Sequence, residues 1–461
     1  MTVQSLLGVG ASGMRAASLG VNVAAQNATN AATEGYTRRS VLQEPLPGPP
    51  RGGNGVRTEG PMRSIDRFVE RRLLGATSAH AEADARLTAI GPLDALFSED
   101  SGLGDALDAF QSALEALAAS PSDRAVRDDV LARADALAEA FHRTNDGIAA
   151  AREDVDLRLT DEVSRANALI GEIDQIQTAM KKAEIGGDEA SDLRDQRDQR
   201  IRELAGLLPI TQIDGERGSV SILLDGGTAL VRAEGGTSPL GTSTDPTTGL
   251  VRVTRNVSGL DEDITARLRG GSIGGLLAAR DGALADALSD LDQLAFDVAG
   301  AYSAAHSAGF GLDGVAGRRL FEAGATATGA ALAFVVSTDV AGQPDRLAAA
   351  SDPTLVAGDN RNALALTALS STRFTTSGRT ASEALSDLVA SVGRAVDGAD
   401  RDATLLESAR SQAWSVRESI SGVNSDDEMI ALTQYQRAYE ASLKVVQTAD
   451  EMLQELLQMK R

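Results

Sequence analysis

The chain has 461 residues, no cysteine and 3% aromatic residues, and its 66 acidic against 44 basic side chains give a formal net charge of −22. The acidic balance argues against a general nucleic-acid binder and against docking on anionic membranes, and the missing cysteines exclude disulfides, thiolate catalysis and cysteine-ligated metals. The length suggests about three domains, and without a run of 18 apolar residues no membrane span is expected.

Residues 1–33 predict a helix that packs against other helices. Arg15 is their only charged side chain, and several glycines interrupt them, so a Sec-type signal peptide is not expected. Apolar residues recur every 3.5 positions, a coiled-coil pattern with small residues in half of its slots. These slots hold Leu7, Met14, Val21 and Ala28, and Gly10, Ala17, Ala24 and Ala31. A solvated helix would carry charges on its other faces, which this segment lacks.

The helical pattern ends after Asn30, at Glu34-Gly35-Tyr36. The prolines and glycines of residues 45–55 predict a linker or extended arm: Pro45, Pro47, Pro49, Pro50, Gly52, Gly53 and Gly55. From about residue 65 to 207 the apolar spacing predicts long amphipathic helices. Pro92 and Pro121 mark their breaks, and Ser120-Pro121-Ser122-Asp123 is a good helix-capping signal.

From Leu208-Pro209-Ile210 onward the apolar period changes to that of short strands and hairpins between glycine-rich turns. This part ends near residue 265, and a strong helix is predicted over about 273–307. Residues 308–358 return to glycine-rich loops with one apolar strand at 333–336. Helix dominates again from about Ala381, with a break near Gly422.

The last predicted helix, 426–461, has heptads of its own. One apolar stripe contains Met429, Leu432, Tyr439, Leu443, Val446, Leu453 and Leu457. Acidic residues at its start and Lys460-Arg461 at its end match the helix dipole. Packing in an ordinary core would explain either terminal helix alone, but two matched seams at opposite ends of the chain favour pairing with each other.

Two glycine-rich motifs could carry chemistry, and neither has the required context. Gly8–Gly13 matches the dinucleotide pattern GxGxxG, but residues 2–7 form a weak strand and 27–34 are too polar for the second one. Gly270–Gly274 matches the nucleophile pattern GxSxG around Ser272, but a charged segment replaces the buried strand. Carboxylate pairs such as Asp195 and Asp198 arise by chance in so acidic a chain. We therefore expect no enzyme activity, cofactor or metal.

Residues 27–38, Asn-Ala-Thr-Asn-Ala-Ala-Thr-Glu-Gly-Tyr-Thr-Arg, resemble the N-terminal signature of the bacterial flagellar rod, hook and hook-associated protein family. Glu34 stands where proline is commoner. Residues 421–424, 435–441 and 448–453 resemble the partner signature near the C-terminus of that family, with Ser425 in place of the usual leucine. Segments 192–198, 274–281, 306–309 and 358–363 resemble its hook-associated members in particular. The resemblance extends over nearly the whole chain.

The resemblance implies a structural subunit at the hook–filament junction, exported without a cleaved signal by the flagellar type III pathway. Such a subunit would form a ring of copies on the extracellular flagellum. Its partners would be the hook protein and a second junction protein, and through the latter the flagellin filament. An export chaperone would hold the C-terminal helix beforehand. A hook or distal-rod subunit is an alternative, which the long helices at 150–207 disfavour. A secreted hydrolase or adhesin on a flagellar scaffold, resting on Ser272 or the variable middle, is another.

The expected fold is mainly α with a smaller β part: paired terminal coiled-coil helices, a long helical bundle and a small β-rich outer domain. We predict four parts. Residues 1–44 with 416–461 form a terminal assembly domain, 45–207 with 266–310 and 380–415 a helical domain, 208–265 a small β-rich domain, and 311–379 a mixed segment packed on the helices. The predicted assembly interface comprises Leu7, Met14, Ala17, Val21, Ala24, Asn27, Asn30, Gly35, Tyr36, Arg38, Met429, Leu432, Tyr439, Leu443, Val446, Leu453 and Leu457.

Overall fold

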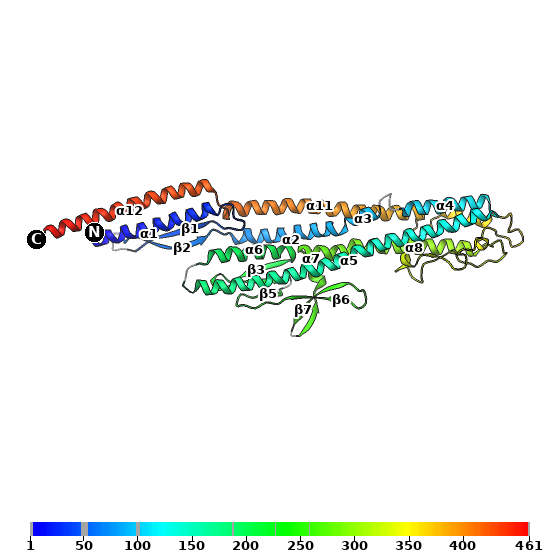
Figure 1. The fold of residues 1–461 in the computed structure, drawn as a ribbon, viewed down its shortest axis with the longest axis horizontal. Helices are drawn as coiled ribbons and strands as arrows, with labels where there is room; N and C mark the ends of the chain where they lie inside the picture. Colours follow the sequence, from blue (N-terminus) through cyan, green and yellow to red (C-terminus); the bar gives the residue numbers. More distant parts are fainter. Residues whose placement is uncertain are drawn as a thin grey trace.

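The computed structural model describes residues 3–47, 54–97, 102–186, 189–225, 227–257 and 259–459. Part of the predicted linker, Pro49, Pro50, Gly52 and Gly53, and the basic end Lys460-Arg461 lie outside these ranges. The molecule is elongated, and both chain ends lie at the same end of it (Figure 1). Most of the described chain is helical and the remainder includes a few small antiparallel sheets, which confirms the predicted fold class.

The helices run mostly along the long axis (Figure 1). In chain order they are α1 (Val3–Thr29), α2 (Arg67–Ile90), α3 (Pro92–Leu96), α4 (Leu103–Ala119), α5 (Arg124–Ala183), α6 (Ser191–Leu207), α7 (Gly271–Ala278), α8 (Leu284–Ser307), α9 (Ala330–Ala333), α10 (Arg361–Ala368), α11 (Ala381–Ser421) and α12 (Ser425–Met459). The predicted breaks are confirmed: Pro92 begins α3, and Asp123 caps α5 by accepting a hydrogen bond from the Ala125 amide.

The strands form four small sheets. They are β1 (Arg39–Pro45), β2 (Val56–Arg63), β3 (Ile210–Asp214), β4 (Val220–Leu224), β5 (Ala229–Val231), β6 (Leu240–Thr244), β7 (Val251–Val257), β8 (Leu260–Asp263), β9 (Phe321–Glu322) and β10 (Val335–Val336). β3-β4-β5 and β6-β7-β8 are antiparallel sheets, and β1-β2 and β9-β10 are antiparallel pairs. Asn167 of α5 fastens the second sheet by exchanging two 2.8 Å hydrogen bonds with the Leu240 backbone.

One continuous apolar core extends through the helical body, from Leu74 of α2 to Ala399 of α11. At one end of it aromatic rings meet edge to face, with Phe110 5.2 Å from Tyr302 and 5.4 Å from Phe321 between ring centroids. No described residue of α1 or α12 belongs to this core. The two terminal helices therefore depend on each other, and on polar contacts, for their place in the molecule.

The structure corrects three predictions of local structure. The expected linker connects two strands instead of forming an isolated arm: β1 ends at Pro45, β2 begins at Val56, and this antiparallel hairpin lies against α1. The single helix expected over 273–307 is interrupted at 279–283, where Gly282 has φ −107° and ψ −105°. The strand expected at 333–336 is shortened to two residues, since Ala330–Ala333 forms a helical turn.

Candidate functional site

The terminal pair, α1 with α12, packs side by side and antiparallel (Figure 1). Glycines of α1 allow this close approach. At three positions an added Cβ would lie 2.6 Å from an atom of α12: Val446 Cγ2 for Gly10, Ser442 Oγ for Gly13, and Tyr435 Cγ for Gly20. Because side chains do not approach so closely, only glycine lets the two backbones lie this near each other.

The buried seam of α1 follows its small residues. Ala17 and Ala24 are buried, together with Gly10 and Gly20. Leu7, Met14 and Val21, which were predicted to share the seam, lie half-buried along its flank. The larger side chains of α12 fill the space next to the glycines of α1. The contact with α12 therefore follows the small residues of α1, and its bulkier residues Leu7, Met14 and Val21 lie at the edge of that contact.

The predicted stripe of α12 divides into two faces. Leu432, Val446 and Leu453 lie half-buried toward α1, and Ala449, outside the predicted set, is buried there. Met429, Tyr439, Leu443 and Leu457 are exposed by 38% to 66%, alongside Ile430, Val445, Met452, Leu456 and Met459. They lie on both sides of the line of α12 that contacts α1, and we call these nine residues together the open apolar face of α12. Monomeric soluble proteins seldom expose so many large apolar side chains on one element, which points to a further contact.

Asn27, at the C-terminal end of α1, connects three segments through its side-chain amide. The nitrogen donates to the Arg39 carbonyl (2.8 Å) and to Glu428 Oε2 (3.0 Å). The oxygen accepts from the Tyr36 hydroxyl and the Arg39 amide, both at 3.0 Å. Glu428 is itself buried at the start of α12, and Arg38 Nε donates to its other oxygen at 2.7 Å. The two signature segments therefore meet at one carboxylate.

The loop between α1 and β1 fits against α6. Gly35 is buried with φ +80°, a left-handed conformation that favours glycine. The Tyr36 ring, half-buried, stacks with the Arg39 guanidinium 4.9 Å from its centroid. Asn30 has only local partners, since its side chain donates to the Gln26 carbonyl of α1. Most of the predicted residues of this loop thus serve to bring β1 against the body.

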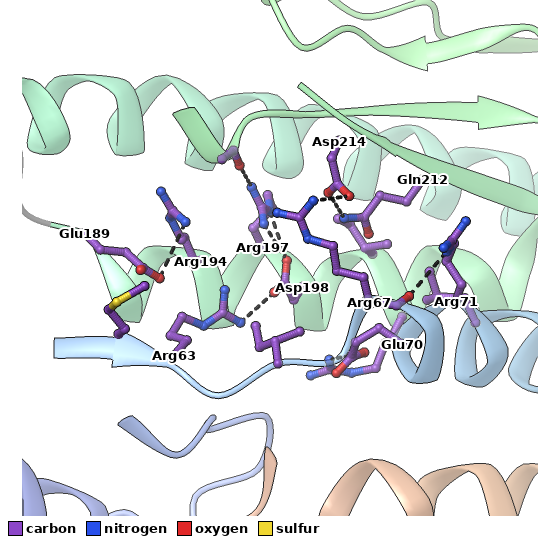
Figure 2. Close-up of a pocket in the computed structure, with 16 residues that line it drawn as sticks. Arg63, Arg67, Glu70, Arg71, Glu189, Arg194, Arg197, Asp198, Gln212 and Asp214 are labelled. Carbon is purple, nitrogen blue, oxygen red and sulfur yellow. Dashed lines mark hydrogen bonds and ion pairs between the residues drawn. The ribbon is translucent and has the colours of Figure 1, made fainter. Parts of the chain in front are cut away.

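The hairpin β1-β2 is held to α6 by a ladder of ion pairs. Arg39 pairs with Asp192 and lies 3.6 Å from Asp195, and Arg63 reaches Asp195 at 2.8 Å and Asp198 at 2.6 Å. Figure 2 shows Arg63 and Arg197 converging on Asp198. Burial alone would raise the pKa of Asp198, but Arg197 and Arg63 outweigh burial and hold that pKa below its ordinary value.

A second ladder joins the end of α11 to α2. Arg417 is almost fully buried, pairs with Glu70 at 3.2 Å and donates to the Thr37 hydroxyl at 3.4 Å. Its guanidinium also lies 5.5 Å from the ring centroid of Trp414. We call these ion pairs and the Asn27 cluster the junction network. The terminal pair is thus attached to the body mainly by charged and polar contacts.

The two motifs that resemble enzyme sites have structural explanations. Gly8–Gly13 lies inside the continuous helix α1, so no strand-to-helix turn exists there to bind pyrophosphate. Ser272 lies in the first turn of α7, and its hydroxyl donates to Glu162 at 3.1 Å. Gly275, three residues later, lies against the Glu82 backbone of α2, where no Cβ has room.

Sequence reasoning found Arg38 but missed most of the other charged members of the junction network. Glu428, Arg63 and Arg417 were not singled out, and Asp195 and Asp198 were treated as a chance pair. Their side chains are buried or nearly so, which is unusual for charged residues. The regular spacing of aspartates on α6, at 192, 195 and 198, was the available signal, because it places three carboxylates on one helix face.

The described ranges contain no helix with the length and hydrophobicity to cross a membrane. Within the same ranges, no group of three or more His, Cys, Asp or Glu side chains is arranged to hold a metal ion.

Comparison with known proteins finds relatives of this chain. Residues 90–321 match the sequence model of the flagellar hook-associated protein FlgK helical domain, and residues 417–459 match that of the flagellar basal body rod FlgEFG protein C-terminal region. Flagellar hook-associated protein 1 of Salmonella typhimurium is 25% identical over 99% of this chain and 100% of its own length. The Bacillus subtilis protein of the same name is 26% identical, over 95% and 94%.

A solved structure supports the fold. The flagellar hook junction protein FlgK from Burkholderia pseudomallei superimposes with a TM-score of 0.69 and 17% sequence identity, over 76% of this chain and 100% of that one. With the helical-domain model covering half of its length, the chain belongs to the flagellar hook-associated protein FlgK family.

Proposed function

We propose that this chain is a structural subunit of the bacterial flagellum and forms the junction between hook and filament as a ring of identical copies. The observation that carries the proposal is the open apolar face of α12, at the end of the molecule where both termini lie. Family membership and the names of the relatives support it. A surface that meets a different surface of the next copy builds rings or tubes.

The predicted interface residues take two roles in this proposal. Ala17, Ala24, Asn27 and Gly35, with Asn30, Tyr36 and Arg38 beside them, hold the terminal pair together and onto the body. Met429, Tyr439, Leu443 and Leu457 contact neighbouring copies, and the half-buried Leu7, Met14, Val21, Leu432, Val446 and Leu453 flank both contacts. The four-part domain division, with residues 1–44 and 416–461 as the assembly unit, belongs to the same proposal.

The proposed partners follow from the same role. The hook protein would lie on one side of the ring and a second junction protein on the other, with the flagellin filament beyond it. We also propose export through the flagellar type III pathway to the extracellular flagellum, with a chaperone covering α12 before assembly. A role without catalysis is proposed, so Ser272→Ala should leave motility unchanged, and a loss of motility would favour the hydrolase alternative.

The test separates assembly from folding. Leu443→Asp puts a carboxylate on the open apolar face, where burial of a leucine would contribute about 1.5–3 kcal/mol per copy. In a deletion strain complemented with this variant, electron microscopy should show hooks without filaments. The thermal midpoint of the purified variant should match that of the wild type, because Leu443 is 38% exposed in the single chain.

Two variants serve as controls. Leu157→Asp, on an exposed position of α5, should leave both filaments and the thermal midpoint intact. Leu204→Asp, at a core position of α6, should lower the midpoint sharply, since a buried unpaired carboxylate costs several kcal/mol. If Leu443→Asp lowers the midpoint as much as Leu204→Asp does, α12 is an ordinary core helix and the proposal fails.

A further inference from the structure

A cavity of about 270 Å³ lies between β2, α2, α6 and β3 (Figure 2). Its charged lining is unbalanced: Glu70, Glu189, Asp198 and Asp214 face six arginines, Arg63, Arg67, Arg71, Arg194, Arg197 and Arg202. In a chain with a net charge of −22 this local excess of cations is the reverse of the overall balance. Most of these arginines have carboxylate partners, so the question is which of them do not.

Three carboxylates of the lining account for four of the arginines. Asp198 pairs with both Arg63 and Arg197, Glu189 lies 3.5 Å from Arg194, and Asp214 lies 3.0 Å from Arg67. Figure 2 shows these side chains directed toward one another across the cavity wall. They form its frame and have little capacity for a further anion.

Arg71 has no such partner among the described residues, and Arg202 has only a long ion pair with Glu70. The side chain of Arg202 is only 10% exposed, and its nearest carboxylate oxygen, Glu70 Oε2, is 3.6 Å away. Glu70 also serves Arg417, at 3.2 Å. Arg71 donates to the Arg67 carbonyl and stacks on Phe68, but pairs with no carboxylate in the described part of the chain.

A guanidinium has five N–H donors, and no described residue accepts a hydrogen bond from Arg202. Burial lowers the pKa of Arg202, Glu70 and Asp198 raise it, and the nearby charges of Arg417 and Arg63 lower it, with a net decrease from its ordinary value. A largely buried guanidinium whose one carboxylate partner also serves Arg417 is incompletely compensated. An anion in the cavity would satisfy these donors and compensate the charge.

We propose that this cavity binds a small inorganic oxyanion of the phosphate class, with the guanidinium groups of Arg202 and Arg71 as its principal ligands. Planar guanidinium groups match the oxygens of such anions with paired hydrogen bonds. The volume suits a phosphate with a few waters, because a water molecule takes up about 30 Å³. The bound anion would connect α2 and α6 beside the loop that carries Gly35.

The only tryptophan of the chain provides a direct probe. Trp414 lies 6.0 Å from the Arg202 guanidinium and 5.5 Å from that of Arg417, measured to the ring centroid. Binding that draws Arg202 toward the cavity would change the surroundings of this ring. Titration of the full-length protein with inorganic phosphate, at constant ionic strength balanced with chloride, should give a saturable change in tryptophan fluorescence.

The same titration should raise the thermal midpoint with the same saturation, because a ligand that binds only the folded state stabilises it. Phosphate also stabilises proteins without binding, through exclusion from the surface, but that effect does not saturate and is the same in all variants. Saturation and its dependence on Arg202 therefore distinguish the two.

Arg202→Gln should weaken the apparent affinity at least tenfold, and the exposed Arg71→Gln should weaken it severalfold. Arg133→Gln, on an exposed position of α5 with only a local ion pair, is the matched control and should bind like the wild type. Should Arg202→Gln fail to fold, the Arg71 variant decides. A wild-type chain without a saturable response, or Arg202 and Arg71 variants that respond like Arg133→Gln, would overturn the proposal. The outcome does not depend on assembly.

Discussion

Asn27 uses the full hydrogen-bonding capacity of one amide, with two N–H groups donating and the oxygen accepting twice. Its four partners come from the loop, β1 and α12. These hydrogen bonds fix the relative position of the three segments more than they stabilise the fold. Each of them replaces a hydrogen bond to water in the unfolded chain, so its net contribution is small.

Asn27→Ala should therefore loosen the terminal pair while leaving the body intact. The Glu428 carboxylate and the Arg39 amide would each lose a buried partner, at a cost of about 1–3 kcal/mol per group. Hydrogen exchange should become faster in α1 and α12 and stay unchanged in α5. Asn30→Ala is the control, because that side chain bonds only within its own turn and loop. Equal exchange in the two variants would contradict the prediction.

His306 is a second residue whose surroundings specify its state. It is fully buried, its Nδ1 lies 2.8 Å from the Arg318 carbonyl, and its Nε2 accepts from the Ala348 amide at 2.8 Å. Nε2 can accept only in the neutral ring, with the proton on Nδ1. Burial lowers the pKa of His306. Among the charged groups that face the ring, Arg318 and Arg127 also lower this pKa, whereas Asp339 raises it.

This environment predicts how stability depends on pH. In the unfolded chain the ring titrates near its ordinary pKa of 6.5, so below that pH the unfolded state binds a proton that the folded state does not. The free energy of unfolding should be constant above about pH 7 and fall as the pH decreases from 6.5 toward 5.5. Chemical denaturation at each pH measures it. A flat profile over that interval would show that His306 is protonated without cost.

At the level of elements, the packing of α1 against α12 depends on glycines, which have no side chain at the contact. Gly20 has the Tyr435 ring directly above its Cα, whereas Gly8 has open space around it. Both lie in α1, where alanine is otherwise better for a helix by about 1 kcal/mol. The two glycines are therefore a matched pair that differs mainly in packing against α12.

Gly20→Ala should separate the helices and reduce the protection of α12 amides against hydrogen exchange. Gly8→Ala should leave that protection unchanged or increase it. Complementation of a deletion strain gives the second readout, in which the Gly20 variant should support fewer filaments than the Gly8 variant. If both variants protect α12 equally, the close approach of the backbones is not what holds the pair.

At the level of elements, the sequence was informative where periodicity is strong. Heptads at both ends and the cap at Asp123 are local signals, and α1, α5 and α12 follow them. Of the two predicted sets of α1 seam slots, Gly10, Ala17 and Ala24 are buried, and the larger Leu7, Met14 and Val21 lie half-buried beside them. The partners of Arg39 lie over 150 residues away on α6, and no local pattern can reveal such a pairing.

As a whole, the molecule consists of a body with a continuous core and a terminal pair outside that core. Isolated helix pairs with few buried apolar contacts open at low free energy. Limited proteolysis of the single chain should therefore cut first within α1, α12 and the loop between α1 and β1, and leave a resistant fragment from α2 to α11. Mass spectrometry of the fragments identifies the cuts. Fragments that keep α1 for as long as the body survives would contradict this division.

The bond between Asn27 and Glu428 joins residues 401 positions apart. During synthesis α1 emerges first and α12 last, so α1 has no partner until almost the entire chain exists. Closing so long a loop is slow compared with forming local contacts. A chain that ends before residue 428 lacks the carboxylate that Asn27 and Arg38 share, and it cannot form the terminal pair at all. The position of this contact thus allows only chains that extend into α12 to form the terminal pair, whereas the body has a core that does not need it.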